Sequence, residues 1–276
     1  MSSNKANIST ESGNDLVLQE VSDGGVLRLT MNDMKRRNAL SEEMMAALAD
    51  AFLQAESDRS VRVIILAAKG PAFSAGHDLK QMTAGRANAD NGRVYFTQVL
   101  STCSALMQLI VNYSKPIIAE VTGVATAAGC QLVASCDLAL AAESALFSTP
   151  GVHIGLFCST PMVALSRNVS NKAAMEMLLT GEMVSATKAE HIGLVNRVVV
   201  DEKLTEATMA MAAKIALKST MTLATGKQAF YKQREMTLAD AYDYASQVMV
   251  DNLLKHDAKE GMNAFIEKRS PQWQDK

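Results

Sequence analysis

The segment PIIAEVTGVATAAGCQL, residues 116–132, contains the strand-to-helix connection that decides the fold class. The apolar run from Pro116 to Val121 predicts a strand that is covered on both faces, and Gly123 ends it. A helix is predicted to follow, from about Ala128 to Ser135. A strand that leads into a helix is the building unit of α/β folds.

The same order of elements continues on both sides of this segment. Val61 to Ala68 predicts another fully buried strand, preceded by a hairpin around Gly24-Gly25 and by a helix that Ser41 caps. Further strands are predicted at about 137–142 and 195–200, and the last third of the chain is helical by periodicity. We therefore expect an α/β fold with right-handed crossovers, with residues 15–200 as its core and residues 201–276 as a helical C-terminal extension.

Composition excludes several classes of protein. A chain of 276 residues, of which 48% are hydrophobic and 20% charged, can bury a large core. The net charge of −2 gives no electrostatic reason to expect a nucleic-acid or anionic-membrane partner, and no apolar run approaches the roughly 20 residues that span a bilayer. The four cysteines lack C-x-x-C spacing and the four histidines lack metal-ligand spacing, so we expect neither a disulfide scaffold nor a metal site.

The first 14 residues are polar and aperiodic, which predicts a flexible tail. They lack the apolar core of a secretory signal and contain no Arg. They do contain the acidic residue Glu11. Mitochondrial transit peptides are rich in Arg and poor in acidic residues. We therefore predict a cytoplasmic location, with the mitochondrial matrix as the less favoured alternative.

Two loops carry the functional signal, and each follows a predicted buried strand. They are AFSAGHDLK, residues 72–80, and GVATAAGCQL, residues 123–132. The second loop enters a helix, whose first amide groups are unpaired and lie at the positive end of the helix dipole. Amides from two such loops can stabilise one oxygen that gains negative charge during a reaction. Tight packing of small residues against the helix is the alternative explanation of the same pattern.

Motifs along nearly the whole chain are similar to those of the crotonase, or enoyl-CoA hydratase/isomerase, superfamily. They stand in the order of the family, and their combination is highly specific. The resemblance implies the crotonase fold, a spiral of ββα units with a helical C-terminal extension. The motifs are NALS (38–41), FSAGHDLK (73–80), PIIA (116–119), CDLA (136–139), AEHIGLV (189–195) and GMNAFIEKR (261–269).

The resemblance implies a CoA thioester as the substrate. In this superfamily the thioester carbonyl lies between two backbone amides that stabilise an enolate-like oxyanion, and the motifs place these donors at His77 and Ala128. The histidine is unusual in this motif, and its imidazole is open to two interpretations, an acid or base and an ordinary surface group. The side chain of Cys130 also has two interpretations, an activated thiol and a small buried residue.

The chain departs from the family pattern at the two glutamates with which active hydratases activate water. Gln131 and Gly151 stand at these positions. Glutamine can orient a water but cannot take its proton near neutral pH, and glycine supplies neither acid nor base. We therefore predict an acyl-CoA- or enoyl-CoA-processing enzyme that stabilises a thioester enolate, with weak ordinary hydration. The alternatives are a non-catalytic acyl-CoA-binding or regulatory protein and, with less support, a CoA thioesterase that uses Cys130 or His77.

The resemblance also implies an assembly and a set of CoA contacts. Family members form trimers or dimers of trimers through their C-terminal helices, so residues 201–276 are predicted to be the trimerisation region of a homotrimer or homohexamer. No tightly bound cofactor is expected, because coenzyme A is part of the substrate. The positions that match CoA-contacting residues are Arg36, Arg37, Ala75, Leu79, Lys80 and Lys268.

Overall fold

A six-stranded sheet forms the centre of the fold in the computed structural model, which describes residues 15–276. The flexible tail predicted at residues 1–14 lies outside the described residues. The first two strands form the predicted antiparallel hairpin, and all other neighbours in this sheet are parallel. In sheet order the strands are β1 (Val17–Val21), β2 (Val26–Met31), β3 (Val63–Ala68), β5 (Ile117–Val121), β7 (Leu138–Ala142) and β10 (Arg197–Val199).

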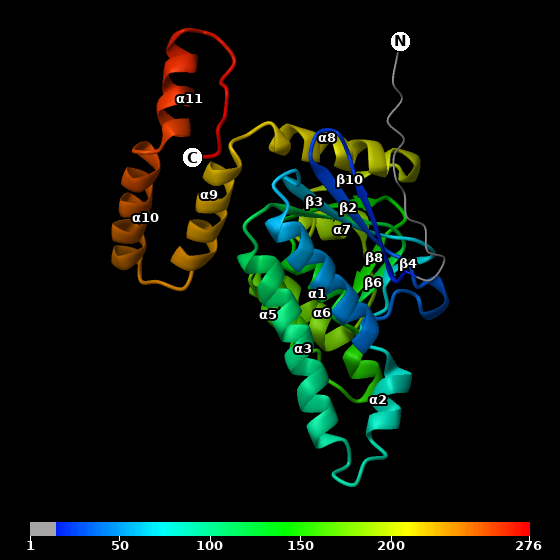
Figure 1. Cartoon of the computed structure of the whole chain (residues 1–276). Helices are drawn as coiled ribbons and strands as arrows, with labels where there is room; N and C mark the ends of the chain where they lie inside the picture. The colour runs from blue at the N-terminus through cyan, green and yellow to red at the C-terminus, as the bar shows by residue number, and fades with distance from the viewer. Residues whose placement is uncertain (1–14) are drawn as a thin grey trace, which may run out of the picture.

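A second, four-stranded sheet is built from short strands, most of which directly follow strands of the first sheet. Its strands are, in sheet order, β4 (Ala72–Ser74), β6 (Val124–Thr126), β8 (Leu146–Ser148) and β9 (Val184–Ser185). β4, β6 and β8 are parallel, and β9 is antiparallel to β8. The chain repeatedly forms a strand of the large sheet, a strand of the small sheet and a helix, which confirms the predicted spiral of ββα units (Figure 1).

Helices cover the sheets and form a C-terminal arm. α1 begins after Ser41, whose hydroxyl accepts a hydrogen bond from the Met44 amide, as the sequence predicts. The α-helices are α1 (Glu42–Ser57), α2 (Leu79–Gly85), α3 (Arg93–Asn112), α4 (Ala128–Ser135), α5 (Pro161–Ser166), α6 (Asn171–Thr180), α7 (Ala186–His191), α8 (Leu204–Ala216), α9 (Thr220–Gln233), α10 (Leu238–Leu253) and α11 (His256–Ile266). Short 3₁₀ helices are η1 (Met34–Arg36), η2 (Pro150–Ile154) and η3 (Asp201–Lys203).

The hydrophobic core joins the two sheets to the helices around them. Phe52 of α1, Phe73 of β4 and Phe147 of β8 are fully buried and belong to one continuous cluster. β3 is buried on both faces, which explains why its sequence VIILAA shows no polar alternation. The small sheet is therefore fixed against the large one, and the loops that leave its strands have a rigid base.

Helix α3 is the one helix of residues 15–276 that is long and apolar enough to cross a membrane by length and composition, with a mean hydropathy of 1.5. Its buried residues are Val99, Cys103, Leu106, Met107 and Ile110, which recur at helical spacing and join the core cluster. α3 therefore packs as an amphipathic helix of the protein core.

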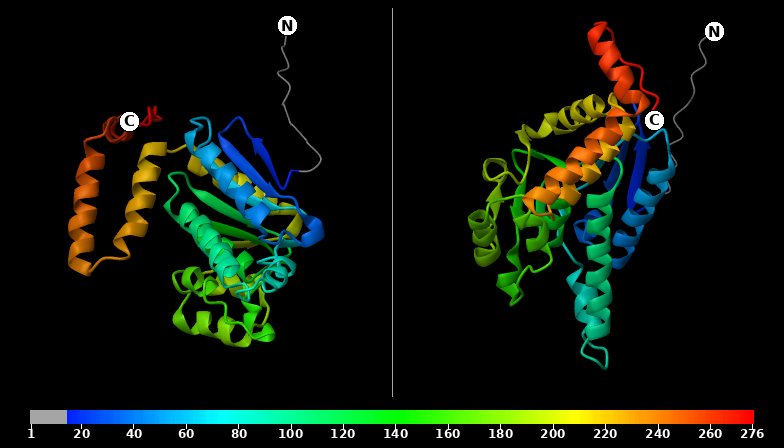
Figure 2. Two further views of the ribbon diagram at one scale, coloured as in Figure 1. Left: turned by 60° about the horizontal axis from the view of Figure 1, so that its bottom comes forward. Right: turned by 90° about the vertical axis from the view of Figure 1, so that its left-hand side faces the viewer.

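Residues 201–276 form one helix that packs on the large sheet and an arm that projects from the body. Leu204, Ala212 and Ala216 of α8 belong to the core cluster. α9, α10 and α11 leave the body together, and Figure 1 and the left view of Figure 2 show them beside it. The arm exposes many large apolar side chains, namely Phe230, Leu238, Tyr242, Met249, Val250, Leu253, Leu254, Met262, Phe265 and Ile266.

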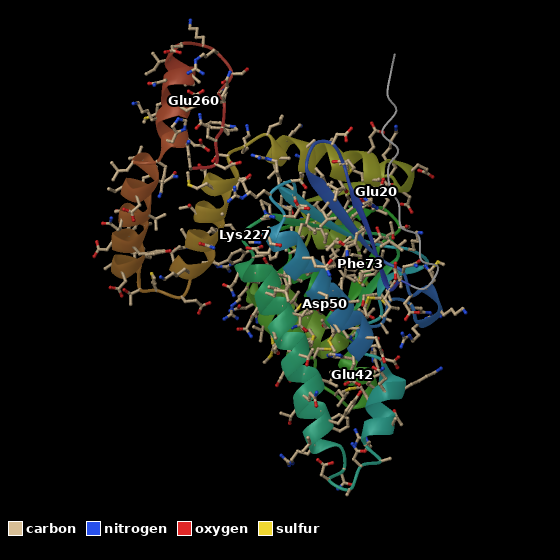
Figure 3. The ribbon with its side chains drawn as sticks, viewed as in Figure 1. Glu20, Glu42, Asp50, Phe73, Lys227 and Glu260 are labelled. Atoms are coloured by element: carbon tan, nitrogen blue, oxygen red, sulfur yellow. The ribbon has the colours of Figure 1, made fainter. Side chains whose placement is uncertain are left out.

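A partly buried ion pair holds the base of this arm to the body. The ammonium of Lys227 in α9 donates to Asp137 Oδ2 at 2.7 Å and also to the backbone carbonyls of Ile110 and Lys115. The Tyr231 hydroxyl, one turn further along α9, donates to the other carboxylate oxygen of Asp137 at 3.0 Å. Figure 3 places Lys227 between the arm and the body. α9 therefore has a fixed position on the core.

Candidate functional site

The candidate site lies where the three parallel strands of the small sheet end. β4, β6 and β8 are neighbours in that sheet, so their carboxyl ends meet at one edge. The loop after β4 carries His77, the connection after β6 carries Ala128, and the segment after β8 carries Gly151. Three segments that are far apart in the sequence therefore converge, and each carries a residue that the sequence analysis selects. Ligand sites in α/β proteins typically lie at such carboxyl ends.

The loop after β4 is held by backbone hydrogen bonds to the segment that precedes α1. The Ala75 amide donates to the Arg37 carbonyl at 3.1 Å, and the Leu40 amide donates to the Gly76 carbonyl at 2.7 Å. Gly76 has a φ of 83°, a conformation that favours glycine. Within residues 15–276 the His77 amide donates to no protein acceptor. It is therefore free to bind an oxygen from outside the chain.

The start of α4 is held in a strained conformation. Ala127 precedes the helix with a φ of 50° and a ψ of −119°, which is unusual for a residue with a side chain. Its amide donates to the Ser148 carbonyl at 2.9 Å, which ties the turn to the end of β8. The next amide, that of Ala128, has no protein acceptor in the described part of the chain. Strain at Ala127 therefore orients the first free amide of the helix.

Glycines bring the two free amides close together. A β-carbon on Gly76 would lie 3.1 Å from the Ala128 nitrogen, so the loop of His77 contacts the start of α4 directly. A β-carbon on Gly129 would lie 2.2 Å from the Ser74 carbonyl oxygen, which shows how closely α4 packs on the end of β4. The sequence analysis places two donors on adjacent loops, and the structure brings those loops together.

Unpartnered polar atoms mark the same place. Among residues 15–276, the buried side-chain nitrogen and oxygen atoms without a hydrogen-bond partner are Nδ1 and Nε2 of His77, Oε1 of Gln131, Oγ of Ser148 and Oγ1 of Thr149. All of them belong to segments at the ends of β4, β6 and β8. Because a buried polar group normally finds a partner, such a group of exceptions indicates a ligand or water site. Ser148 and Thr149 are functional candidates that sequence reasoning missed, since neither lies in a motif with a distinctive signal.

Gln131 and Gly151, where the resemblance predicts glutamates, lie on segments at the same edge. Gln131 follows Ala128 by one helical turn, is 5% exposed, and lines a cavity of about 840 Å³ between α3, α4, α5 and α9. Gly151 lies in η2, where a β-carbon would be 2.9 Å from the Leu156 carbonyl oxygen and 3.0 Å from Cys158 Sγ. Cys158 therefore occupies the space beside Gly151, a contact that sequence reasoning missed.

The two thiols nearest the site are buried and unreactive. Burial raises the pKa of the Cys130 thiol to about 12, and burial also raises the pKa of the Cys158 thiol. Both thiols are therefore protonated near neutral pH, whereas nucleophilic attack requires the deprotonated thiolate. The interpretation of Cys130 as a small buried residue fits the structure better than that of an activated nucleophile.

The residues predicted to contact CoA are only partly gathered at the site. Arg37, Ala75, Leu79 and Lys80 are exposed on the loops that flank Gly76. Arg36 is also exposed, but its guanidinium is engaged with carboxylates, at 2.5 Å from Asp33 and further from Glu43 and Asp78. Lys268 comes two residues after the end of α11, and α11 lies in the arm, away from β4 and β6 of the same chain (Figure 1). The structure thus assembles the first four positions and leaves Lys268 apart.

The described residues offer no metal site. No cluster of three or more His, Cys, Asp or Glu side chains with metal-binding geometry occurs within residues 15–276. The polar groups at the site are two amides, one imidazole, one side-chain amide and two hydroxyls. Such a set can bind and polarise a carbonyl oxygen.

Comparisons with known proteins agree with this geometry. The family model for enoyl-CoA hydratase/isomerase matches residues 22–276. Enoyl-CoA hydratase domain-containing protein 3, mitochondrial, of Rattus norvegicus is 50% identical over 249 residues, which are 90% of this chain and 81% of the relative. The protein of the same name from Homo sapiens is 48% identical over 249 residues, which are 90% of this chain and 80% of the relative.

Solved structures give the same result. The crystal structure of enoyl-CoA hydratase from Mycobacterium smegmatis superposes with a TM-score of 0.90 at 49% identity, and the match covers 94% of this chain and 99% of that one. The crystal structure of human enoyl coenzyme A hydratase domain-containing protein 3 superposes with a TM-score of 0.88 at 46% identity. This match covers 94% of this chain and 100% of the human one. The predicted fold class is therefore confirmed.

The predicted cytoplasmic location is wrong. Five relatives from vertebrates, which are 45% to 50% identical to this chain, are all named as mitochondrial proteins. The prediction depended on the lack of Arg and the presence of Glu11 near the start. Those residues lie outside the described part of the chain, and charge composition over so short a segment is a weak signal.

The family assignment depends on independent observations that agree. The sequence motifs occur in the family's order, the two sheets wind as a spiral of ββα units, and two free amides face the same edge of the small sheet. The matched family model extends over nearly all of the described residues. The chain therefore belongs to the enoyl-CoA hydratase/isomerase family of the crotonase superfamily.

Proposed function

We propose that the protein is an enzyme that acts on an acyl-CoA or enoyl-CoA thioester and stabilises the thioester enolate with the amides of His77 and Ala128. The observation that carries the proposal is that these two amides, from loops in direct contact, lack protein acceptors in the described residues. A thioester carbonyl oxygen between them would accept both hydrogen bonds. The oxygen becomes more negative when an enolate forms, so both bonds would strengthen as the reaction proceeds.

The position of Ala128 adds to this stabilisation. It is the first residue of α4, where the unpaired amides and the helix dipole favour negative charge. In a site that excludes water, one donor of this kind contributes about 3 kcal/mol to the stabilisation of an oxyanion. Backbone donors also hold their position without side-chain ordering, because Gly76 and Gly129 fix the two loops against each other.

Ordinary hydration is expected to be weak. Gln131 has an unpartnered Oε1 that can accept a hydrogen bond from a water, but a side-chain amide does not remove a proton near neutral pH. Gly151 contributes no acid, and Cys158 beside it is protonated and buried. Because one acid or base commonly contributes about 10²- to 10⁴-fold, the loss of both glutamates leaves little hydratase activity.

Coenzyme A and the acyl chain would occupy opposite sides of this centre. The exposed residues Arg37, Ala75, Leu79 and Lys80 flank the loop of His77 and can contact the adenine and phosphates, with Arg37 and Lys80 supplying positive charge. The cavity beside Gln131 offers space for an acyl chain. No resident cofactor is needed for this chemistry, because coenzyme A arrives with the substrate.

We propose further that the protein forms a homotrimer or homohexamer through residues 201–276. The apolar side chains on α9–α11 are exposed in one chain, and burying them is favourable by about 25 cal/mol per Å². Lys268 lies on this arm, too far from its own site, so in the assembly it would supply positive charge to the CoA of a second copy. The expected mass in solution is three or six times that of the chain.

A non-catalytic acyl-CoA-binding protein is the second candidate. The absence of carboxylates at Gln131 and Gly151 favours it, since binding requires the free amides but no acid or base. A thioesterase has less support, because burial raises the pKa of the Cys130 thiol to about 12. The enzyme and the non-catalytic binding protein would bind the same ligand, a CoA thioester, and only the enzyme would convert it.

Calorimetry with butyryl-CoA, crotonyl-CoA and free CoA, beside a crotonyl-CoA hydration assay, tests the proposal. We expect both thioesters to bind more tightly than free CoA, because only they carry the carbonyl. Ala128→Pro removes one donor at a helix position that tolerates proline, and it should abolish turnover. Thermal unfolding of this variant checks that it folds. Failure of every thioester to bind would overturn the proposal, and binding without turnover on any thioester would favour the second candidate.

A further inference from the structure

The side chain of His77 is half-buried on the loop after β4. Both ring nitrogens are inaccessible to solvent, and neither has a hydrogen-bond partner within residues 15–276. The sequence analysis left this side chain open between a surface group and an acid or base, and the covered ring nitrogens favour the second interpretation. A buried polar group without a partner typically costs about 1–3 kcal/mol. Because the loop after β4 lies at the candidate site, this unfavourable free energy indicates that a ligand normally forms the missing hydrogen bonds.

The other unpartnered atoms belong to the two neighbouring strand ends. Gln131 Oε1 lies one turn after Ala128, and the hydroxyls of Ser148 and Thr149 follow β8. Ser148 also fixes the Ala127 turn through its carbonyl. The imidazole is thus the only ring that can accept a proton among these groups, since amides and hydroxyls do not titrate near neutral pH.

The surroundings of His77 keep its ring neutral. Burial lowers the pKa of the imidazole, and the nearby Leu40 carbonyl opposes that shift by favouring the protonated ring. No charged side chain of the described residues contributes to the shift. The closest ones are engaged elsewhere, because Asp78 accepts hydrogen bonds from the Lys80 and Gln81 amides and Arg36 is paired with Asp33. A neutral imidazole has one nitrogen with a free lone pair, which is what a base requires.

We propose that His77 is the proton-transfer group that replaces the missing glutamates, removing a proton from Cα of the bound thioester while its own amide and that of Ala128 hold the carbonyl oxygen. The inference rests on the function proposed above. In this step the Cα–H bond breaks, its electron pair forms the carbon–carbon double bond of the enolate, and the carbonyl oxygen takes the negative charge. The proton remains on the ring nitrogen and can return to Cα. With a 3-enoyl thioester, whose enolate is conjugated with the remaining double bond, the proton can instead be delivered to the γ-carbon.

The placement of ring and amide on one residue gives this step its geometry. The His77 amide fixes the carbonyl oxygen, and Cα of the acyl group is separated from that oxygen by only two bonds. The ring belongs to the same residue as this amide, so rotation about the His77 side-chain bonds would bring a ring nitrogen, covered in the free chain, to the reacting carbon. Protonation of the ring also places a positive charge beside the enolate, and the Leu40 carbonyl stabilises that charge.

The exchange of Cα hydrogens of butyryl-CoA for deuterium in D₂O, followed by NMR, tests the assignment without knowledge of the natural acyl chain. His77→Gln keeps the amide and removes the base, so we expect exchange to fall at least 100-fold while the calorimetric Kd stays within about threefold. His191→Gln is the matched control, because His191 is exposed on α7, and it should exchange like the wild type. Added imidazole should restore part of the exchange in His77→Ala.

The pH profile separates a catalytic from a structural role. Wild-type exchange should rise with pH through a value below about 6.5, the ordinary histidine pKa, and should then be constant. The rise of the exchange rate with pH should be missing in His77→Gln. Exchange in His77→Gln within threefold of the wild type overturns the assignment, and so does a wild type that binds butyryl-CoA without exchange. A wild type that binds no thioester instead overturns the proposed function.

Discussion

Substitution of Gly129 by alanine tests the two-amide site through backbone geometry alone. The added β-carbon would lie 2.2 Å from the Ser74 carbonyl oxygen, whereas ordinary contact begins at about 3.4 Å. α4 must therefore move away from β4 by about 1 Å, and Ala128 moves with it. A hydrogen bond of about 2.9 Å that lengthens by this amount is lost.

The expected effect on chemistry follows from the loss of one donor. Loss of an oxyanion donor costs about 2.7–4 kcal/mol, or roughly 10²- to 10³-fold in rate. Because 1.36 kcal/mol corresponds to one pKa unit, the pKa of bound acetoacetyl-CoA should rise by roughly two units relative to the wild type. The ultraviolet absorbance of the acetoacetyl-CoA enolate, measured against pH with saturating protein, reports this shift directly.

A matched control separates this effect from the general consequences of Gly→Ala in a helix. Gly226 lies in α9, and a β-carbon there would meet no atom within 4 Å. Gly226→Ala should stabilise the protein by up to about 1 kcal/mol and leave the enolate absorbance unchanged. Gly129→Ala should instead lose about 1–3 kcal/mol of unfolding free energy from overpacking. An enolate pKa in Gly129→Ala equal to that of the wild type would refute the role of the Ala128 amide.

Other contacts make separate predictions. Lys227→Met leaves the Asp137 carboxylate without the ammonium at 2.7 Å, so the free energy of unfolding, measured with denaturant, should fall by about 3 kcal/mol. A fall below about 0.5 kcal/mol would contradict a structural role of the pair. Burial raises the pKa of the Cys130 thiol to about 12, so iodoacetamide at pH 8 should modify it only after unfolding, and rapid labelling of the native protein would contradict its burial. Arg269 and the Gln272 amide lower the pKa of Glu260 to about 2, so the stability that this carboxylate contributes is present above its ordinary pKa and lost as the pH falls toward 2. NMR titration of Glu260 should show this value in the wild type and an ordinary one in Arg269→Met.

The large sheet could be predicted because its strands carry a strong local signal. VIILAA and IIAEV are apolar on both faces, and each is bounded by residues that end strands. Ser41 and the apolar periodicity after it likewise mark α1. Such elements are determined by their own residues, so a single sequence is enough to find them.

The small sheet could not be predicted in the same way. β4, β6 and β8 have three residues each, too few for a periodic pattern, and they form only because distant segments pair. The family resemblance placed the two predicted amide donors at His77 and Ala128, and both amides lack protein acceptors in the described residues. The position of the His77 loop depends instead on pairing with the distant Leu40, and the position of α11 depends on where the arm leaves the body.

The structure shows close packing at Gly151 that the sequence does not reveal. A glutamate at position 151 would need space that the Leu156 carbonyl and Cys158 Sγ occupy. The two amides, in contrast, are held by glycine contacts and by the Ala127 turn, where a larger side chain would clash or strain the backbone. On the proposed function, oxyanion stabilisation therefore depends on the backbone, whereas proton transfer depends on side chains and on the space that the loops leave for them.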